Sequence, residues 1–329
     1  MGDRAALRRT LSIFAVTLGI PLWIGLAPVW IVVALVVDAL GGLKRLPTLR
    51  LCVYLLVYLF YELIGTISAT WLWLAGSAGR SLNLSQHRAV QGWWATGLIR
   101  WGGHLLGIRL DLDDPTTLPP DTFILLSRHA SMVDAVIPAA VITGQLQRYV
   151  HYVIKRELRW DPSIDLFGTR LGNHFVARGQ ETEIEEQAIA ELGEQAQPDS
   201  ALVIFPEGTY STPQTRRRVL DSLKRRGDRS LVERAEALQA LLPPKPAGTL
   251  ALLSSQPDAD VVVVGHVGLE GVAELPGLRR RLPLTSPVTV RWWTHRRSEL
   301  PSTDDGLTEW LGERWLELDR WVVETRNSG

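Results

Sequence analysis

The sequence predicts an α/β domain with a mostly parallel central sheet flanked by helices, preceded by an N-terminal membrane-embedded two-helix hairpin. Two long apolar stretches, residues 11–37 and 51–78, open the chain. Beyond residue 110, short apolar runs alternate with longer helical patterns, as in proteins built from βαβ units. We therefore expect residues 1–85 to form a membrane anchor and residues 86–329 to form the α/β domain.

The composition excludes several classes of protein. The 329 residues suffice for one large domain or for a domain with an appendage. The 35 basic and 35 acidic residues balance, so no overall charge attracts nucleic acid. The single cysteine, Cys52, excludes an intramolecular disulfide and a cysteine-based zinc site. Thirteen Trp against six Phe are typical of rings at a bilayer interface or of a Trp-rich core.

The two apolar stretches are each long enough to cross a membrane. Residues 11–37 carry no charge, and residues 51–78 carry only Glu62. At about 1.5 Å per residue, each helix could cross a hydrocarbon core of about 30 Å. A signal peptide has an apolar region about half as long and is not followed so closely by a second stretch. The alternative is a buried helical hairpin of a soluble protein.

The short connector, residues 41–50, makes the two helices antiparallel neighbours. Basic residues precede, separate and follow them, so the distribution of charge does not select a topology. Pro21 and Pro28 could bend the first helix into a hairpin that only dips into the bilayer. Both arrangements leave the α/β domain on one side, which we expect to be the cytoplasmic side of the cell membrane. Glu62 is costly in lipid unless it faces the partner helix or the headgroups.

The remaining elements follow from hydrophobic periodicity. Residues 88–109 form an amphipathic helix, which either lies in the membrane interface or packs onto the domain. The expected strands are residues 123–126, 149–154, 201–205, 261–264 and 288–293. The expected helices are residues 131–143, 181–196, 213–242, 249–253 and 307–323.

A histidine and an aspartate follow the first of these strands. His129 lies in the turn after the strand, and Asp134 comes about one helical turn later. Open α/β sheets place their sites at the carboxyl ends of strands. An aspartate bonded to one imidazole nitrogen fixes the tautomer and leaves the other nitrogen as a base. With seven His in the chain, a chance match is the alternative.

Three further segments offer polar groups at strand or helix ends. Arg178 closes the run Gly-Asn-His-Phe-Val-Ala-Arg, which we expect to be a strand that ends in a functional cation, and the alternative is a solvated strand end. Glu207, Gly208 and Thr209 follow a strand as Phe-Pro-Glu-Gly-Thr, where the alternative is a simple glycine turn. Lys245 lies in a proline-rich loop before a helix, a position that suits a phosphate.

Four features that follow one another along the chain together resemble the glycerolipid acyltransferase family. They are the His-x4-Asp of 129–134, the Gly-x-x-Phe-Val-x-Arg of 172–178, the Phe-Pro-Glu-Gly-Thr of 205–209 and the strand 261–264. Its best-known members are the 1-acylglycerol-3-phosphate acyltransferases, and the resemblance covers roughly residues 90 to 270. It implies direct transfer without a cofactor or a metal. The acceptor hydroxyl, deprotonated by His129, attacks the thioester of acyl-CoA or acyl-carrier protein, while Asp134 orients His129.

The resemblance further implies that Arg178, Glu207, Gly208 and Thr209 bind a glycerol-phosphate acceptor. The expected partners are membrane lipids, the acyl donor and a lysophospholipid, and no nucleic acid. The expected reaction converts 1-acylglycerol-3-phosphate to phosphatidic acid.

Two departures from the family pattern keep alternatives open. Tyr210 stands where the family usually has an arginine linked to the acceptor phosphate. Gly265-His266 follows the strand 261–264, in which the family usually has a proline. Lys245 or Arg216 could supply the missing charge. Another lysolipid or glycolipid acceptor, or a non-catalytic lipid-binding relative, would also accommodate Tyr210. A hydrolase of the usual kind is disfavoured because the chain has no Gly-x-Ser-x-Gly motif.

Overall fold

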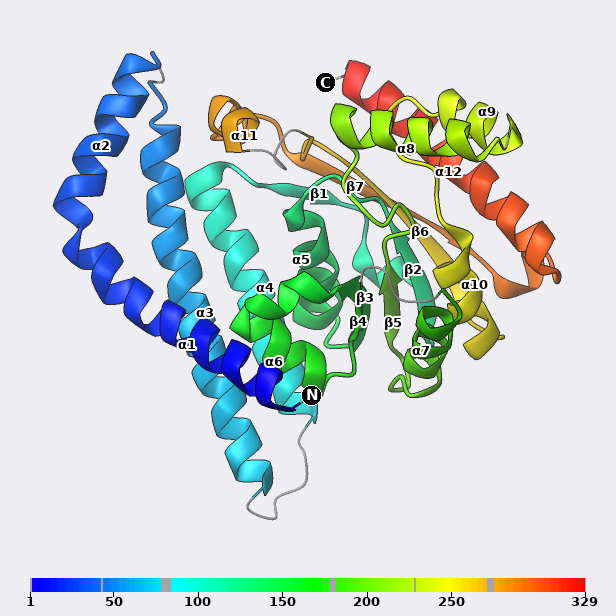
Figure 1. Ribbon diagram of the computed structural model, residues 1–329, viewed down its shortest axis with the longest axis horizontal. Helices are drawn as coiled ribbons and strands as arrows, with labels where there is room; N and C mark the ends of the chain where they lie inside the picture. Colours follow the sequence, from blue (N-terminus) through cyan, green and yellow to red (C-terminus); the bar gives the residue numbers. More distant parts are fainter. Residues whose placement is uncertain are drawn as a thin grey trace.

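The central sheet has the predicted α/β architecture. The computed structural model describes residues 2–42, 44–77, 84–177, 182–227, 229–270 and 275–328. Seven strands lie in the order β1-β7-β6-β2-β5-β3-β4 (Figure 1). Every neighbouring pair is parallel except β6 with β7. The strands are β1 (Leu110–Leu112), β2 (Phe123–Ser127), β3 (Val150–Lys155), β4 (His174–Val176), β5 (Ala201–Ile204), β6 (Asp260–Val267) and β7 (Val288–His295).

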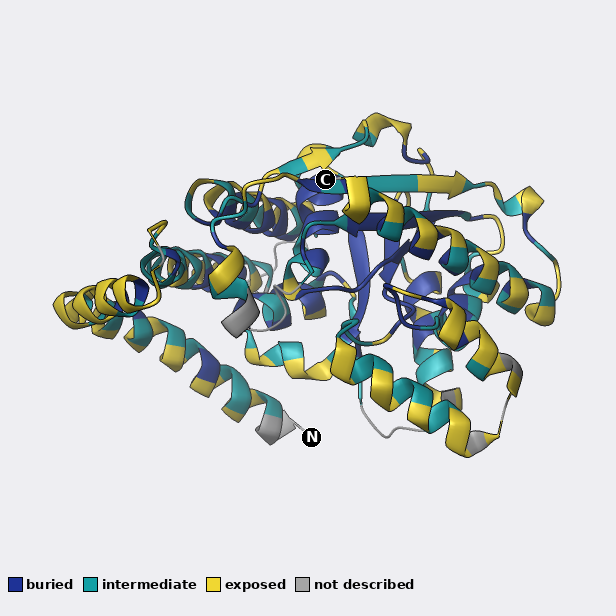
Figure 2. Ribbon diagram, turned by 90° about the horizontal axis from the view of Figure 1, so that it is seen from above, coloured by how far each residue is buried: buried dark blue, intermediate teal, exposed yellow. Residues whose placement is uncertain are grey.

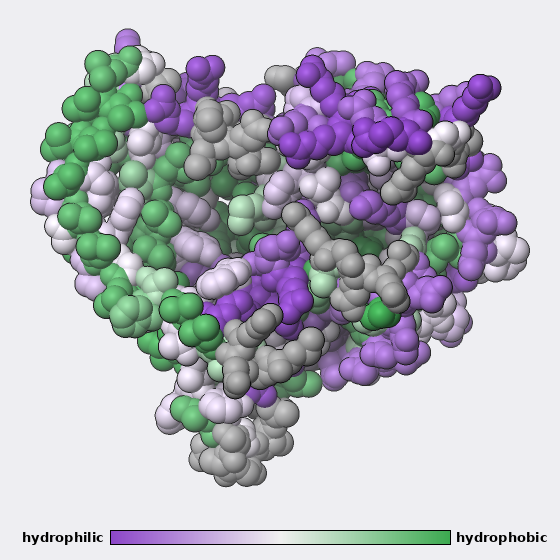
Figure 3. All heavy atoms as spheres, viewed as in Figure 1, coloured by the Kyte–Doolittle hydropathy of each residue, from purple (hydrophilic) through white to green (hydrophobic). Residues whose placement is uncertain are grey.

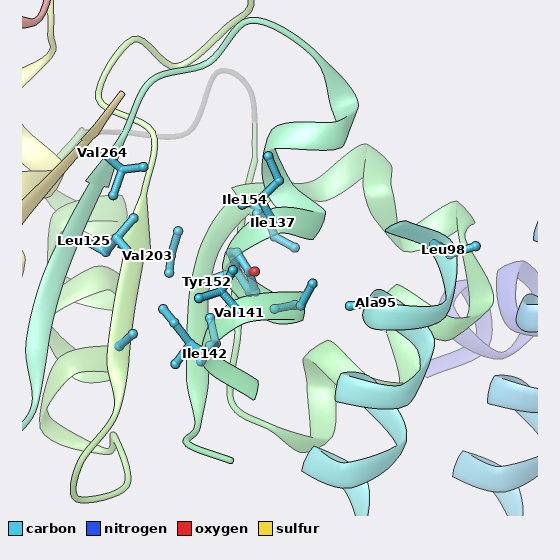
Figure 4. Packing of buried hydrophobic residues seen from close by; sticks show 14 of the residues in the cluster. Ala95, Leu98, Leu125, Ile137, Val141, Ile142, Tyr152, Ile154, Val203 and Val264 are labelled. Carbon is cyan, nitrogen blue, oxygen red and sulfur yellow. The ribbon is translucent and has the colours of Figure 1, made fainter. Parts of the chain in front are cut away.

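Helices cover both faces of the sheet, because successive residues of the central strands point to opposite sides. In β2, Phe123 and Leu125 pack towards α4 (Leu84–Leu106), as Figure 4 shows for Leu125. Ile124 and Leu126 lie in a second cluster, whose helices are α7 (Thr182–Glu194), α10 (Pro246–Ser255) and α12 (Asp304–Ser328). The central strands β2, β5 and β6 are accordingly among the most deeply buried parts of the molecule (Figure 2). The predicted helix 88–109 thus packs onto the domain.

The N-terminal region contains three helices where two were predicted. They are α1 (Gly2–Gly25), α2 (Ala27–Leu40) and α3 (Pro47–Ser77). The first apolar stretch breaks at Leu26, just before Pro28, which lies in the first turn of α2. A proline ring clashes with the carbonyl four residues earlier and provides no N–H, so one helix cannot run straight through.

Residues 5–25 and 47–76 are long and apolar enough to cross a membrane, whereas the 14-residue α2 is shorter. Apolar side chains gather over this edge of the molecule (Figure 3).

Buried polar contacts fasten the N-terminal helices to the sheet domain. Glu62 of α3 is fully buried and accepts hydrogen bonds from Trp94 Nε1 (2.7 Å) and the backbone N–H of Ser163 (3.2 Å). Asp165 pairs with Arg8 (2.9 Å) and Arg9 (2.7 Å) of α1. Glu62 therefore faces the α/β domain instead of the headgroups or the other helix of the hairpin. The division at residue 85 stays a prediction.

Several shorter elements differ from the prediction. The helix expected at 131–143 starts as a 3₁₀ turn (Met132–Ala135), continues as α5 (Val136–Pro138) and ends in a π-helical turn (Ala139–Gln145). The segment 213–242 holds α8 (Pro213–Arg226) and α9 (Arg229–Ala237), separated at Gly227, whose φ is +76°. Elements that were not predicted are β1, α6 (Pro162–Arg170), α11 (Leu275–Arg281) and the 3₁₀ turns Pro115–Thr117, Arg156–Trp160 and Arg297–Glu299.

The C-terminal helix α12 is joined to the loop before Lys245 by one buried carboxylate. Asp319 accepts hydrogen bonds from the backbone N–H groups of Gln239 (2.8 Å), Ala240 (2.7 Å) and Leu241 (2.8 Å). The side chain is buried. Asp319 therefore fixes the path of the chain between α9 and α10.

We expect Asp319→Ala to lower the free energy of unfolding by about 3 kcal/mol, because it leaves buried backbone donors without an acceptor. Chemical denaturation of the two proteins measures the difference. Glu309→Ala, at an exposed position of the same helix, is the matched control and should change the value by less than about 0.5 kcal/mol. Equal losses in both variants would contradict the role given to Asp319.

Candidate active site

The residues of interest meet at one edge of the sheet, where parallel strands end. Ser127 ends β2, Ile204 ends β5 and Lys155 ends β3, and these three strands are neighbours. The loops that follow β2 and β5 bring His129 and Glu207 together: the backbone N–H of His129 donates to Glu207 Oε1 over 2.8 Å. The site therefore lies where open α/β sheets place their ligands.

His129 and Asp134 are adjacent, as their spacing predicts. His129 Nδ1 lies 3.5 Å from Asp134 Oδ2. The aspartate is held by its own turn: Oδ2 accepts hydrogen bonds from the N–H groups of Ala130 and Ser131, and Oδ1 accepts one from the Ser131 hydroxyl (2.8 Å). Because Nδ1 faces the carboxylate, Nε2 is the nitrogen that remains for a substrate.

Asp134 is fully buried and has a second imidazole beside it. His266 Nε2 lies 3.4 Å from Asp134 Oδ1. Burial by itself raises the pKa of Asp134, but His266 and His129 oppose it more strongly and hold the pKa of this carboxyl well below its usual range. Asp134 is therefore a carboxylate at neutral pH.

Two aromatic rings enclose the His129 imidazole. The ring centroids of Phe205 and Tyr210 lie 4.5 Å and 4.3 Å from that of His129. This burial lowers the pKa of His129 below its ordinary value of 6.5, although Asp134 acts in the opposite direction. The imidazole is thus neutral at pH 7 and has a free electron pair on one nitrogen.

Glu207 holds the His129 turn in place through its carboxyl group. Its Oε1 accepts the N–H of His129, and its Oε2 accepts the N–H of Leu242 over 2.9 Å. Burial raises the pKa of Glu207 to about 7, even though both backbone donors favour the charged form. Glu207 is absent from the described residues that line the adjacent cavity. The carboxylate thus connects backbone segments, and the acceptor contact that the resemblance implies for Glu207 stays a prediction.

The other predicted residues fall into two groups. Gly208, Thr209 and Lys245 line the cavity beside His129. Gly208 has φ +68°, and a Cβ there would lie 3.3 Å from Lys245 Nζ, so both the backbone conformation and the neighbouring cation favour glycine. The backbone N–H of Lys245 donates to the carbonyl of Pro206 (2.9 Å) and ties the two loops together. Arg178 lies outside the residues that the structure describes.

Comparison with known proteins agrees with this arrangement. Residues 109–245, which include both His129 and Glu207, match the family model described as Acyltransferase. The comparisons therefore support the glycerolipid acyltransferase family that the sequence motifs indicate.

The mouse (Mus musculus) protein named 1-acyl-sn-glycerol-3-phosphate acyltransferase epsilon is 26% identical over 219 residues, which cover 63% of this chain. The match spans 59% of that relative's length. The crystal structure of the 1-acyl-sn-glycerophosphate (LPA) acyltransferase PlsC from Thermotoga maritima superposes with a TM-score of 0.52 at 16% identity, covering 84% of this chain and 98% of that one. The similarity shows that the two proteins share a fold.

The cavity beside His129 is large and mostly apolar. Its volume is about 790 Å³, and His129 forms part of its wall. Its lining includes the His129 turn and the helix after it, the ends of β3 and β5, and the helices α3 and α4. Tyr54 and Tyr58 of α3 and Leu98 of α4 belong to the last group. The helices that fasten the N-terminal region to the domain therefore also enclose the space beside the reactive nitrogen.

Three residues at the site were not assigned a role from the sequence. Lys155 lines the cavity, and its Nζ lies 5.0 Å from the centre of the Tyr210 ring. Its place directly after the predicted strand 149–154 was a usable signal. Tyr210 was noted only as a departure from the family pattern, and its packing on His129 depends on the fold. His266 comes from β6, whose position beside β2 no local pattern reveals.

We expect Glu207→Gln to reduce acyl transfer by about a hundredfold, because the new amide NH₂ faces a backbone N–H and displaces the His129 turn. A misplacement of about 1 Å near the reacting atoms has that effect. Steady-state acyl transfer and thermal unfolding are measured together. Glu194→Gln, at an exposed position of α7, should match the wild type in both. Wild-type activity in Glu207→Gln would contradict the role of Glu207 in holding the His129 turn.

Proposed function

We propose that the protein is a membrane-associated O-acyltransferase that moves a fatty acyl chain from acyl-CoA or acyl-carrier protein to a hydroxyl of a lysophospholipid. The acceptor we propose is 1-acylglycerol-3-phosphate, which would give phosphatidic acid. One observation carries the proposal: a neutral histidine, paired with a buried carboxylate, opens onto a large apolar cavity beside apolar helices. A base for a hydroxyl and a space for an acyl chain are what the reaction requires.

The chemistry proceeds by direct transfer. His129 Nε2 takes the proton of the acceptor hydroxyl as its oxygen attacks the thioester carbonyl, and Asp134 stabilises the imidazolium that forms. The tetrahedral intermediate then collapses, the carbon–sulfur bond breaks, and the thiolate leaves with the proton from His129. The products are an ester and a free thiol. A positioned general base of this kind contributes about 10²–10⁴-fold to the rate.

The acyl chain occupies the apolar cavity. Its walls include Leu98, Val136, Ile154 and Phe167, and it reaches the face of α3. Burial of each CH₂ group contributes about 0.8 kcal/mol, so a long chain is held without specific polar contacts. The apolar helix α3 lines the same cavity through Tyr54 and Tyr58, which gives a lipid a short route to the site.

Cations and backbone groups that line the cavity provide for the phosphate of the acceptor. Lys155, at the end of β3, and Lys245, in the loop before α10, line the same cavity as His129, Gly208 and Thr209. A lysine binds phosphate as a compact point charge. The resemblance adds Arg178 to this group. We further propose membrane lipids as partners, no cofactor besides the acyl donor, and a location of the α/β domain at the cytoplasmic face of the cell membrane.

A second acceptor class is favoured by one observation. Tyr210 occupies the position of the family's phosphate-linked arginine and packs on His129, where it narrows the site with a neutral ring. Another lysolipid or a glycolipid would use that ring as a stacking surface. A panel of acceptors therefore has to include lysolipids with larger headgroups and glycolipids.

We expect purified wild-type protein in lipid micelles to transfer a labelled acyl group to 1-acylglycerol-3-phosphate, and His129→Ala to lose a hundredfold or more of that activity. His104→Ala, at an exposed position of α4, is the control and should retain the wild-type rate. If the wild type acts only on other acceptors, the proposed substrate is wrong but the proposed mechanism stands. Full activity of His129→Ala, or none of the wild type with either donor, would contradict the proposed function.

The pH dependence of kcat/KM should report the base. Only neutral His129 can accept a proton, so activity falls as the pH drops through its pKa. Burial lowers that pKa, so the acidic limb should have its midpoint below 6.5. The profile is measured over pH 5 to 8 with an acceptor whose charge does not change there. A midpoint clearly above 6.5 would show that a different group acts as the base.

A further inference from the structure

A second histidine contacts the carboxylate that orients His129. His266 is 1% exposed and lies on β6, which pairs with β2 so that Ser127 is opposite Val264. This register brings His266 beside the turn that follows β2. Its Nε2 lies 3.4 Å from Asp134 Oδ1, whereas His129 Nδ1 lies 3.5 Å from Asp134 Oδ2. One carboxylate thus stands between two imidazoles.

The surroundings hold His266 firmly in place. Its carbonyl accepts a hydrogen bond from Arg128 Nη1, and the buried Arg128 side chain pairs with Glu270 at 2.6 Å. Glu270 in turn pairs with Arg326 of α12 at 3.0 Å. At Gly265, next in the chain, a Cβ would lie 2.5 Å from the Leu318 side chain, so β6 packs tightly against α12. His266 is therefore a fixed point on the sheet.

The two neighbours of the His266 Nε2 atom assign its proton. They are the carbonyl of Arg128 at 3.3 Å and Asp134 Oδ1 at 3.4 Å, and both can only accept. The Nδ1 atom is buried and has no hydrogen-bond partner within the part of the chain that the structure describes. Nε2 therefore bears the proton, which faces both its hydrogen-bond partner, the Arg128 carbonyl, and the neighbouring Asp134 carboxylate.

The remaining donors to Asp134 all come from its own turn. They are the N–H groups of Ala130 and Ser131 and the Ser131 hydroxyl. Because these groups move with the aspartate, they set its side-chain conformation but not its place relative to the sheet. His266 is the contact from a separate strand.

We propose that His266 is a positioning residue: its Nε2–H holds Asp134 Oδ1, so that Oδ2 stays directed at His129 Nδ1. The inference rests on the proposed function and deepens it. His266 is not among the described residues that line the cavity, so it acts through Asp134 and does not touch substrate.

The test compares His266→Leu, which removes the donor, with His266→Gln, whose amide can still reach Asp134. We expect His266→Leu to lower kcat about ten- to hundredfold, the range that loss of a hydrogen bond to a charged group covers. KM for donor and acceptor should stay within about twofold of the wild type. His266→Gln should recover most of kcat, a result that a purely packing role would not produce.

A double-mutant cycle with Asp134→Asn identifies the route. If His266 acts through Asp134, His266→Leu should change kcat by less than about twofold in the Asp134→Asn background. His151→Leu is the matched control, since His151 is also buried, lies on β3 and accepts a hydrogen bond from the N–H of Gln197. It should alter thermal stability without altering kcat. His266→Asn, whose short amide cannot reach Asp134, replaces His266→Leu if that variant does not fold.

Each outcome decides the matter. Wild-type kcat in His266→Leu, equal losses in the Leu and Gln variants, or independent effects of His266→Leu and Asp134→Asn would overturn the positioning role. If His129→Ala loses activity but His266→Leu keeps the wild-type kcat, only the positioning role of His266 is contradicted. Full activity in His129→Ala would instead remove the proposed function beneath it.

Discussion

The site depends on how the buried turn after β2 satisfies its backbone. The N–H groups of His129, Ala130 and Ser131 point into the protein, where each unmatched donor would cost about 1–3 kcal/mol. Glu207 accepts the first, and Asp134 accepts the other two. Backbone donors offset part of the cost of burying these two carboxyl groups, although burial still raises the pKa of Glu207 to about 7. The direction of the His129 imidazole follows from this arrangement, since the groups that satisfy the turn also fix its orientation.

The same use of carboxylates extends the site across the molecule. Glu207 also accepts the N–H of Leu242, and Asp319 accepts the three N–H groups just before it. The loop that carries Lys245 is thereby tied to the His129 turn at one end and to α12 at the other. The final helix, which lies outside the family resemblance, thus supports both the cation loop and, through Arg326 and Glu270, the strand of His266. Changes far along the chain can therefore displace groups beside the reactive nitrogen.

Features set by local sequence were predictable, and those set by pairing between distant segments were not. The central strands are short apolar runs because both faces are covered, and His129 and Asp134 meet because only four residues separate them. β1 was missed because three residues, Leu-Asp-Leu, are too few to establish a periodicity, and α6 was missed because its nine residues contain only three large apolar side chains. His266 reaches Asp134 only through the order of strands in the sheet. The prediction of one helix over residues 11–37 was wrong, because it gave more weight to the apolar composition than to Pro28, which breaks the helix.

Glu62 shows why the anchor and the site have to be considered together. A carboxyl group in an apolar helix would be costly in lipid, yet here it receives hydrogen bonds from Trp94 and Ser163, so α3 has one face that fits only against this domain. That face also presents Tyr54 and Tyr58 to the cavity beside His129. On the proposed function, the helix that meets the bilayer is thus a wall of the acyl site, and an acyl chain passes from lipid to the base without exposure to water. Fastening the anchor by a buried polar group, in place of a flexible linker, keeps that wall in register with the reactive nitrogen.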